Sequence, residues 1–296
     1  SPFVARKRGA ALVARNIAAH IERDVLDKPK DWQPLIYCWR GGQRSGSLSL
    51  VLSQIGFRVQ VIEGGYQAYR RAVMADLEKL PEGLRLRVLC GKTGSGKSRL
   101  LAALQSQGAQ VLDLEGIANH RGSVLGLVPG QPQPTQKRFD SVLWDTMRRL
   151  DPAQPVWVES ESRKVGELRV PEQLIHHMRA STCVRVELSV AARVRLLMED
   201  YDFFVNDVPA FCERLNALRA LRGNEVINEW QAAASSGRIE GVVEQLLTTH
   251  YDPVYLQSMQ RNYADFPSAT LVEPPDGDHA TLQEVARSLL MSAEAG

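Results

Sequence analysis

Residues 84–98 read LRLRVLCGKTGSGKS, and this stretch decides the fold of the chain that follows it. The run LRLRVLC has the composition of a buried strand, and a helix is predicted from Lys97 to Gln107. The eight residues GKTGSGKS at 91–98 match the pattern GxxxxGK[ST] in full, directly after a strand and at the start of a helix. The stretch therefore predicts a P-loop.

This loop has the chemistry of a diphosphate-binding site. Its glycines let backbone N–H groups converge on phosphate oxygens, and the helix N-terminus adds positive potential. Lys97 would balance the charge of a β-phosphate, and the Ser98 hydroxyl could hold Mg²⁺. The pattern does not specify the group attached to the diphosphate. The predicted diphosphate-binding residues are Gly91, Thr93, Gly94, Ser95, Gly96, Lys97 and Ser98.

Strands and helices alternate downstream of the loop, which predicts an α/β domain with a parallel sheet over residues 84–296. A mostly helical segment is expected at about 191–261. The other predicted strands are 109–114, 155–159, 183–188 and 269–272, and the other predicted helices are 136–150 and 279–294.

Polar residues follow two of these strands and are candidates for the same site. Glu159 ends the strand PVWVE, where it could support a metal ion or be a surface acid, and the sequence leaves both readings open. The run with Glu161 and Arg163 is balanced between a solvated face and a role in the site. After the strand 109–114, Arg121 is predicted to contact phosphate, against the alternative of a solvated loop capped by Asp113. The candidates of this loop are Asp113, Glu115, His120 and Arg121.

A cysteine loop lies in the first part of the chain. Cys38 follows the predicted strand 35–38 and precedes WRGGQRS, which leads into a predicted helix at about 45–55. Gly41 and Gly42 would let the backbone amides point inward, and the nearby arginines and the helix dipole would stabilise a thiolate. The predicted residues around Cys38 are Arg40, Gly41, Gly42, Gln43, Arg44 and Ser45. The remaining cysteines lie in or beside apolar runs and are expected to pack.

Two chemistries use such a loop. The spacing Cys-x5-Arg-Ser is the tyrosine-phosphatase pattern, whereas rhodanese-like sulfurtransferases use a related loop whose cysteine carries sulfur. The flanking sequence favours the second, because a strand at 57–62 and then EGGYQAYRR (63–71) resemble a rhodanese segment. We therefore predict an α/β rhodanese-like domain at 1–80, short at its N-terminus, with helices at 10–24 and 66–80 and a boundary at 81–83.

Composition sets the wider limits. Hydrophobic residues make up 44% and charged residues 24% of the chain, and no apolar run approaches the roughly 20 residues of a membrane span. No signal peptide is visible, and the four cysteines suggest neither zinc binding nor a disulfide framework, so a reducing cytoplasm is expected. Residues 1–80 hold 13 Lys/Arg and 7 Asp/Glu, a net charge of +6. This balance would suit a polyanionic partner, and it is equally compatible with surface charge that serves no partner.

The combination of the two loops resembles one family, tRNA 2-selenouridine synthase. The matching segments are YCWRGGQRS (37–45), IEGGYQAYR (62–70), GKTGSGKS (91–98), DLEGIANHRGSVLG (113–126), VESESRKVG (158–166) and YDPVY (251–255). The resemblance implies a two-step transferase acting on a 5-substituted wobble 2-thiouridine of tRNA. Geranyl diphosphate would first alkylate the sulfur, and selenium from selenophosphate would then replace it.

The resemblance also distributes the roles of the residues. It implies that the P-loop, with Lys97, binds the diphosphate, and that Cys38, Arg40 and Arg44 serve the selenium step. The co-substrates would be geranyl diphosphate and selenophosphate, with Mg²⁺ as an optional ion, and tRNA would be the macromolecular partner. Two alternatives remain: a P-loop small-molecule kinase fused to a sulfurtransferase or phosphatase-like module, and a non-catalytic binding protein.

Overall fold

The chain forms two compact units, which are described separately. The computed structural model describes residues 1–123, 126–127 and 130–294, so Val124 and Leu125 of the motif at 113–126 lie outside the described residues. The units are Ser1–Ala75 and Asp76–Gly296. The sequence-predicted boundary at 81–83 falls on the short 3-10 helix η1 (Leu80–Gly83).

The second unit is built on a parallel sheet, as predicted. Within the described residues its strand order is β4-β5-β3-β8-β9, and every neighbouring pair is parallel. The carboxyl ends of the central strands therefore lie at one edge, where parallel sheets bind their ligands. The strands are β3 (Arg85–Cys90), β4 (Gln110–Leu112), β5 (Pro155–Glu159), β8 (Thr182–Val186) and β9 (Thr270–Val272).

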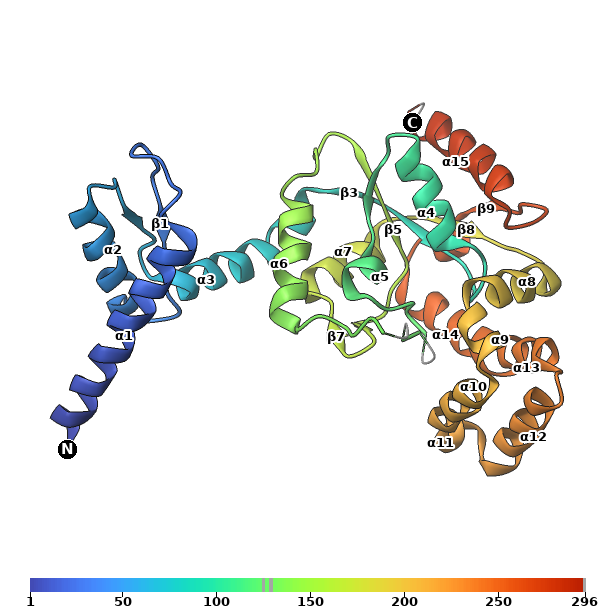
Figure 1. Cartoon of the computed structure of the whole chain (residues 1–296). Coiled ribbons are helices and arrows are strands. Elements are labelled where there is room, and N and C mark those ends of the chain that lie inside the picture. Colours follow the sequence, from blue (N-terminus) through green and yellow to red (C-terminus); the bar gives the residue numbers. More distant parts are fainter. Residues whose placement is uncertain (124–125, 128–129, 295–296) are drawn as a thin grey trace. The chain divides into compact units, whose positions relative to one another are not determined.

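Helices cover the sheet from both sides (Figure 1). On one side, α4 (Lys97–Ser106) and α15 (His279–Glu294) share a buried core with the sheet, in which Leu89, Trp157 and Leu282 pack together. On the other side lie α6 (Gln136–Met147) and α7 (Glu172–Ala180). Apolar burial on both faces explains why the strands read as continuous hydrophobic runs.

Within the described residues, the short elements that directly follow β4 and β5 were not predicted. A five-residue helix, α5 (Leu114–Ala118), follows β4, and a small antiparallel hairpin, β6 (Lys164–Val165) with β7 (Leu168–Arg169), follows β5. Each is too short to produce a readable periodicity.

The predicted helical segment is confirmed and has its own core. Phe211, Leu215, Ile227 and Trp230 are buried together in it. Its elements within the described residues are α8 (Val190–Asp200), α9 (Asp202–Asn206), α10 (Val208–Leu215), η2 (Asn216–Leu218), α11 (Arg219–Arg222), α12 (Asn224–Ser235), α13 (Ile239–Gln245), the π-helix η3 (Leu246–Tyr251), α14 (Asp252–Asn262) and η4 (Phe266–Ser268).

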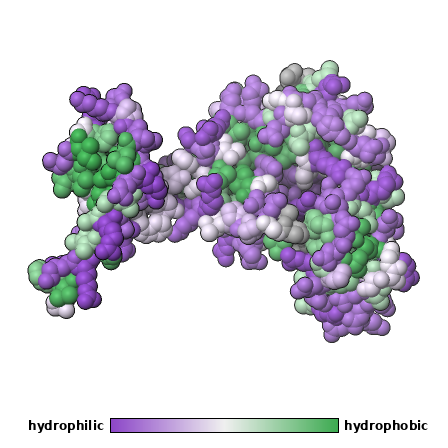
Figure 2. Space-filling view, viewed as in Figure 1, coloured by the Kyte–Doolittle hydropathy of each residue, from purple (hydrophilic) through white to green (hydrophobic). Residues whose placement is uncertain are grey.

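The first unit is a small α/β layer. Its strands β1 (Leu35–Ile36) and β2 (Gln60–Val61) pair in parallel but are shorter than predicted, and its helices are α1 (Pro2–Asp24), α2 (Gln43–Ile55) and α3 (Gly65–Leu77). The helix α1 begins eight residues earlier than predicted, because the Ser1 hydroxyl caps it by accepting from the Val4 N–H. Apolar side chains remain exposed on this unit, and Figure 2 shows the hydrophobic surface that they form.

A buried ion pair joins the helical segment to the P-loop. The Arg193 guanidinium of α8 is 1% exposed and donates to both carboxylate oxygens of Asp252, over 2.8 and 2.6 Å. Its Nε donates to the carbonyl oxygen of Thr93 over 2.9 Å. Such a pair is costly to break from one side, because the remaining charge stays buried without its partner.

No helix among the described residues is long and apolar enough to cross a membrane.

We expect Arg193→Ala to lower the free energy of unfolding of the second unit by about 3–5 kcal/mol, because it leaves Asp252 unpaired. Arg149→Ala is the matched control, since Arg149 pairs with Asp145 at the surface and is 68% exposed. The control variant should lower the free energy of unfolding by only about 0–1 kcal/mol. Urea unfolding followed by tryptophan fluorescence measures both, and equal losses in the two variants would contradict this role of the pair.

Candidate functional site

The P-loop lies between β3 and α4 at the carboxyl edge of the sheet. Gly94 and Gly96 have φ angles of +78° and +79°, a region that side-chain-bearing residues rarely adopt. A Cβ on Gly91 would lie 2.7 Å from the Val186 carbonyl oxygen, so this position also requires glycine. The Lys97 Nζ donates to the Gly91 carbonyl oxygen over 2.8 Å and so bends back over the loop. The loop has the geometry of an anion cradle.

The segment YDPVY at 251–255 holds this loop from the other side. The Gly91 N–H donates to the Tyr255 hydroxyl over 2.5 Å, and Asp252 holds Arg193, which in turn contacts Thr93. Burial raises the pKa of Tyr255 above its ordinary value, so its phenol stays neutral. These contacts were missed by the site predictions because they join residues that are 59 to 164 positions apart.

Three glutamates form an acidic cluster beside the loop. Glu115, Glu159 and Glu161 bring carboxylate oxygens within 4.8 Å of one another, and the Ser98 hydroxyl lies 3.4 Å from Glu115 Oε2. Glu159 is 2% exposed, and its Oε1 has no hydrogen-bond partner among the described residues. The sequence analysis left open whether these residues face the solvent or the site. In the structure Glu159 is buried and Glu161 is half-buried, whereas Arg163 is exposed.

Burial and mutual repulsion shift the titration of this cluster. Desolvation, and then the neighbouring carboxylates, raise the pKa of Glu115 to about 10. Desolvation and Glu159 raise the pKa of Glu161 to about 8, and desolvation also raises the pKa of Glu159. Lys97 acts in the opposite direction on all three. At neutral pH the cluster therefore holds protons that a cation could replace.

The candidates that follow β4 have different positions. Asp113 is the N-cap of α5 and accepts from the Gly116 N–H over 2.7 Å, which is the structural role weighed for it. His120 is buried, which lowers its pKa, and its Nδ1 accepts from the Gly122 N–H. The Arg121 guanidinium donates to the Asp200 carbonyl oxygen and lies 4.8 Å from the Tyr201 ring centroid. Its predicted contact with phosphate stays a prediction.

A single hollow joins these groups. It has a volume of about 980 Å³. It brings the P-loop, the acidic cluster and Arg121 to one surface, whereas Asp113, His120 and Arg163 do not line it. The charged and hydroxyl groups in its lining include Lys97, Ser98, Arg99, Glu115, Arg121, Glu159, Glu161, Arg179, Arg222 and Tyr255. The hollow can bind a polyanion and, at its acidic side, a cation.

The cysteine loop of the first unit lies between β1 and α2. Gly41 and Gly42 have φ angles of +78° and +72°, and the Ser45 hydroxyl lies 3.3 Å from the Cys38 Sγ. The pKa of Cys38 is lowered to about 7, chiefly by the Ser45 hydroxyl and then by backbone N–H groups of the loop. The sequence analysis assigned the stabilisation of the thiolate to the nearby arginines and the helix dipole. The main cause is instead the buried Ser45 that follows them.

The backbone around Cys38 depends on the second glycine of the EGGY turn. The Tyr66 N–H donates to the Cys38 carbonyl oxygen over 3.0 Å. Gly65 has a φ of +54°, and a Cβ at this position would collide with the same carbonyl oxygen. The Trp39 and Tyr66 rings stack beside the turn with centroids 4.6 Å apart. The turn and the cysteine loop are therefore one packed unit.

Fold and site define a P-loop α/β protein with an acidic cluster at the loop and a separate unit that carries an activated cysteine. Residues 84–222 match the sequence model of a family described as the tRNA 2-selenouridine synthase AAA domain.

Whole-chain comparisons find relatives named tRNA 2-selenouridine synthase. The relative from Alcanivorax borkumensis is 31% identical over 254 residues, covering 76% of this chain and 69% of its own length. That from Nitrosomonas europaea is 31% identical over 271 residues, covering 77% and 70%. That from Marinobacter nauticus is 31% identical over 279 residues, covering 83% and 74%. The chain belongs to the tRNA 2-selenouridine synthase family.

We expect the Cys38 thiol to be alkylated by iodoacetamide with an apparent pKa of about 7. Because only the thiolate reacts, the rate should rise as the pH is raised through this value and then level off. Ser45→Ala removes the main cause of the lowered pKa, so at neutral pH its rate should be about tenfold lower. Mass spectrometry of the Cys38 peptide across a pH series measures the rates.

The control for this experiment is Ser47→Ala, because the Ser47 hydroxyl lies on the same helix and donates to the Gln43 carbonyl oxygen instead. Its pH profile should match that of the unmodified sequence. An unchanged profile in Ser45→Ala would show that the serine does not activate the thiol.

Proposed function

We propose that this chain is a tRNA 2-selenouridine synthase that modifies a 5-substituted 2-thiouridine at the wobble position of tRNA in two steps. The observation that carries the proposal is the anion cradle with Lys97, which opens into the hollow lined by the acidic cluster. Membership of the family supports the substrate, since the relatives carry this name. The basic balance of residues 1–80 suits a polyanionic partner such as tRNA.

The first proposed step is alkylation. The thiocarbonyl sulfur attacks the first carbon of geranyl diphosphate, the carbon–oxygen bond breaks, and pyrophosphate leaves with the electron pair. The N3 proton is lost, which gives a neutral S-geranyl nucleotide. Lys97 and the amides of the P-loop stabilise the charge that develops on the leaving pyrophosphate, so the loop contributes without ATP hydrolysis.

The second proposed step exchanges the chalcogen. Selenium from selenophosphate adds at the ring carbon, geranyl thiol leaves, and water cleaves the phosphorus–selenium bond to release phosphate. Selenium enters already reduced, so no oxidant or reductant is consumed. The Cys38 loop is assigned to this step because it combines a thiolate with anion-binding groups, namely the side chains of Arg40 and Arg44 and the backbone amides that bond the sulfur.

The acidic cluster fits Mg²⁺. Its donors are carboxylate and hydroxyl oxygens, which this ion prefers. Glu159 Oε1, which has no hydrogen-bond partner in the described part of the chain, offers a buried ligand atom. Glu115, Glu159 and Glu161, with Ser98, would hold the ion. When bound, Mg²⁺ would neutralise part of the diphosphate charge and compensate the three carboxylates.

The two loops should separate by mutation. Lys97→Ala should slow formation of the S-geranyl nucleotide by at least about 100-fold, because the leaving diphosphate loses its main cation. Cys38→Ser should leave this step intact and stop formation of 2-selenouridine. Nucleoside analysis of thiolated tRNA, incubated with each purified variant and both co-substrates, measures the two products.

Lys137→Ala, at an exposed position on α6 away from the hollow, is the control and should keep both activities. Normal selenation by Cys38→Ser would remove the proposed role of that thiol. Normal geranylation by Lys97→Ala would remove the proposed role of the P-loop.

The acidic cluster predicts how stability depends on pH. Its folded-state pKa values are raised above the ordinary value of 4.5, so the stability that it contributes is fully present below about pH 4.5 and is lost progressively as the pH rises to about 8 to 10. In metal-free buffer the melting temperature should therefore fall over this range. Mg²⁺ should raise it, and more so at higher pH, because the ion competes with protons.

Glu159→Gln should flatten this pH dependence and weaken the response to Mg²⁺, whereas Glu172→Gln, at an exposed position on α7, should change neither. Thermal unfolding across pH, with and without Mg²⁺, measures both. A melting temperature that rises with pH in metal-free buffer, or an unchanged Mg²⁺ response in Glu159→Gln, would contradict the assignment.

A further inference from the structure

We propose that an apolar cavity in the helical segment binds the hydrocarbon chain of the diphosphate substrate, and that the far end of this cavity sets the chain length. The inference rests on the proposed function, because it takes the substrate to be a prenyl diphosphate. It adds a binding site and a specificity-determining residue, Phe211, that the P-loop by itself does not supply.

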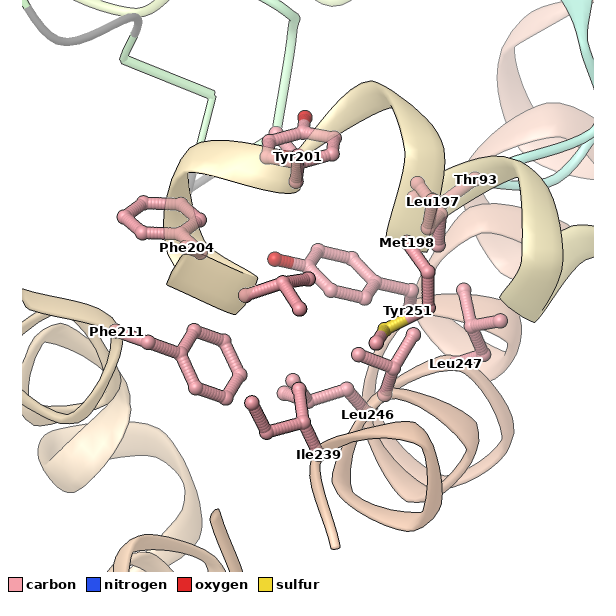
Figure 3. A pocket seen from close by; sticks show the side chains of 13 residues that line it. Thr93, Leu197, Met198, Tyr201, Phe204, Phe211, Ile239, Leu246, Leu247 and Tyr251 are labelled. Carbon is pink, nitrogen blue, oxygen red and sulfur yellow. The ribbon is translucent and has the colours of Figure 1, made fainter. Parts of the chain in front are cut away.

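The cavity is lined by side chains from α8, α9, α10, α13 and the π-helix η3 (Figure 3). Its lining is almost wholly apolar, with Leu197, Phe204, Phe211, Ile239 and Leu246 among its walls. The cavity has a volume of about 60 Å³, which is several times the roughly 10–15 Å³ that one water molecule needs on the same measure. Protein cores normally close such space by packing, so its persistence here favours a ligand.

The mouth of the cavity lies at the P-loop. Five residues line both this cavity and the large hollow, so the two spaces adjoin each other: Thr93, Ser123, Leu197, Tyr201 and Tyr251. The P-loop backbone lies directly against α8, because a Cβ on Gly94 would be 3.0 Å from Leu197. A diphosphate in the loop would therefore have its organic end beside the opening.

The far end is closed by aromatic and branched side chains. Figure 3 places Thr93 and Leu197 on one side of the space, and Phe211 and Ile239 on the opposite side. Phe204 and Phe211 pack with ring centroids 5.7 Å apart, and both are buried. A hydrocarbon tail that enters at Thr93 would end against these rings. Replacing Phe211 with a smaller side chain should therefore make room for a longer tail.

The wall is formed in part by the π-helix. Leu246, Leu247 and Tyr251 all come from η3, and Asp252 directly after it holds Arg193. Helices of this kind are rare and often occur at functional sites. Here the wider turn places cavity-lining residues and the P-loop anchor on consecutive positions of the chain.

The test is a calorimetric titration of the full chain with inorganic pyrophosphate, dimethylallyl, geranyl and farnesyl diphosphate. Affinity should rise by at least about tenfold from dimethylallyl to geranyl diphosphate, because more apolar surface is buried, and should fall at farnesyl diphosphate. Phe211→Ala should reverse the preference between geranyl and farnesyl. Pyrophosphate affinity should be unchanged by this variant.

A second variant protects the test against misfolding of the first. Val243→Phe fills the cavity from α13. It should lower the affinity for geranyl diphosphate at least about tenfold and leave the affinity for pyrophosphate unchanged. Val226→Phe is its control, since Val226 packs against the same core from α12 but does not line the cavity. Circular dichroism confirms that each variant is folded.

The outcomes separate this inference from the proposed function. One outcome would show that the hydrocarbon tail binds elsewhere and that only the cavity assignment is wrong. In that outcome all the diphosphates bind with equal affinity, Lys97→Ala abolishes this binding, and the cavity variants do not change it. If no diphosphate binds, or if binding is independent of Lys97, the proposed function and the cavity assignment fall together.

Discussion

The buried contact between Arg193, Asp252 and the Thr93 carbonyl is the constraint on which the site depends. It fixes the P-loop against α8 and the segment YDPVY, so the anion cradle and the helical segment share one edge. Tyr255 reinforces the same junction through Gly91. A guanidinium at 1% exposure is tolerated because its charge is paired and its donors are satisfied.

Charge is distributed around this junction in a way that suits diphosphate chemistry. Lys97 bends over the loop, while Glu115, Glu159 and Glu161 gather beside Ser98. The carboxylates are too close and too buried to ionise together unaided, as their raised pKa values indicate. A diphosphate and a divalent cation would compensate each other and the surrounding groups, so the site is best matched by the pair of them.

Local sequence accounted for much of the fold. The strand 155–159 and the helix 279–294 have the predicted bounds, and the loop 91–98 has the predicted strand–loop–helix context, because each carries an uninterrupted pattern with clear ends. Two-residue strands such as β1 and β2 are harder to predict from sequence, because their length is set by tertiary pairing and not by a local sequence pattern. The division into domains at 81–83 and the rhodanese-like character of residues 1–80 stay predictions.

The candidate site was predictable only in part. Its loop residues were readable because they are adjacent in sequence, as were Cys38 and its glycines. The partners of these residues were not readable. Arg193 and Tyr255 reach the P-loop from distant helices, and nothing local distinguishes Phe211 as a cavity wall from an ordinary core residue. The Ser45 hydroxyl was included in the loop, but its leading effect on Cys38 depends on a distance that sequence does not give.

The central claim is that the P-loop binds a prenyl diphosphate as an alkyl donor and does not use a nucleotide. Competition between ATP and geranyl diphosphate for the purified chain, in the presence of Mg²⁺, tests it most directly. The account predicts that geranyl diphosphate binds, and that ATP in large excess neither displaces it nor is consumed. Tight ATP binding with transfer of its terminal phosphate, and no binding of geranyl diphosphate, would contradict the account and favour a kinase.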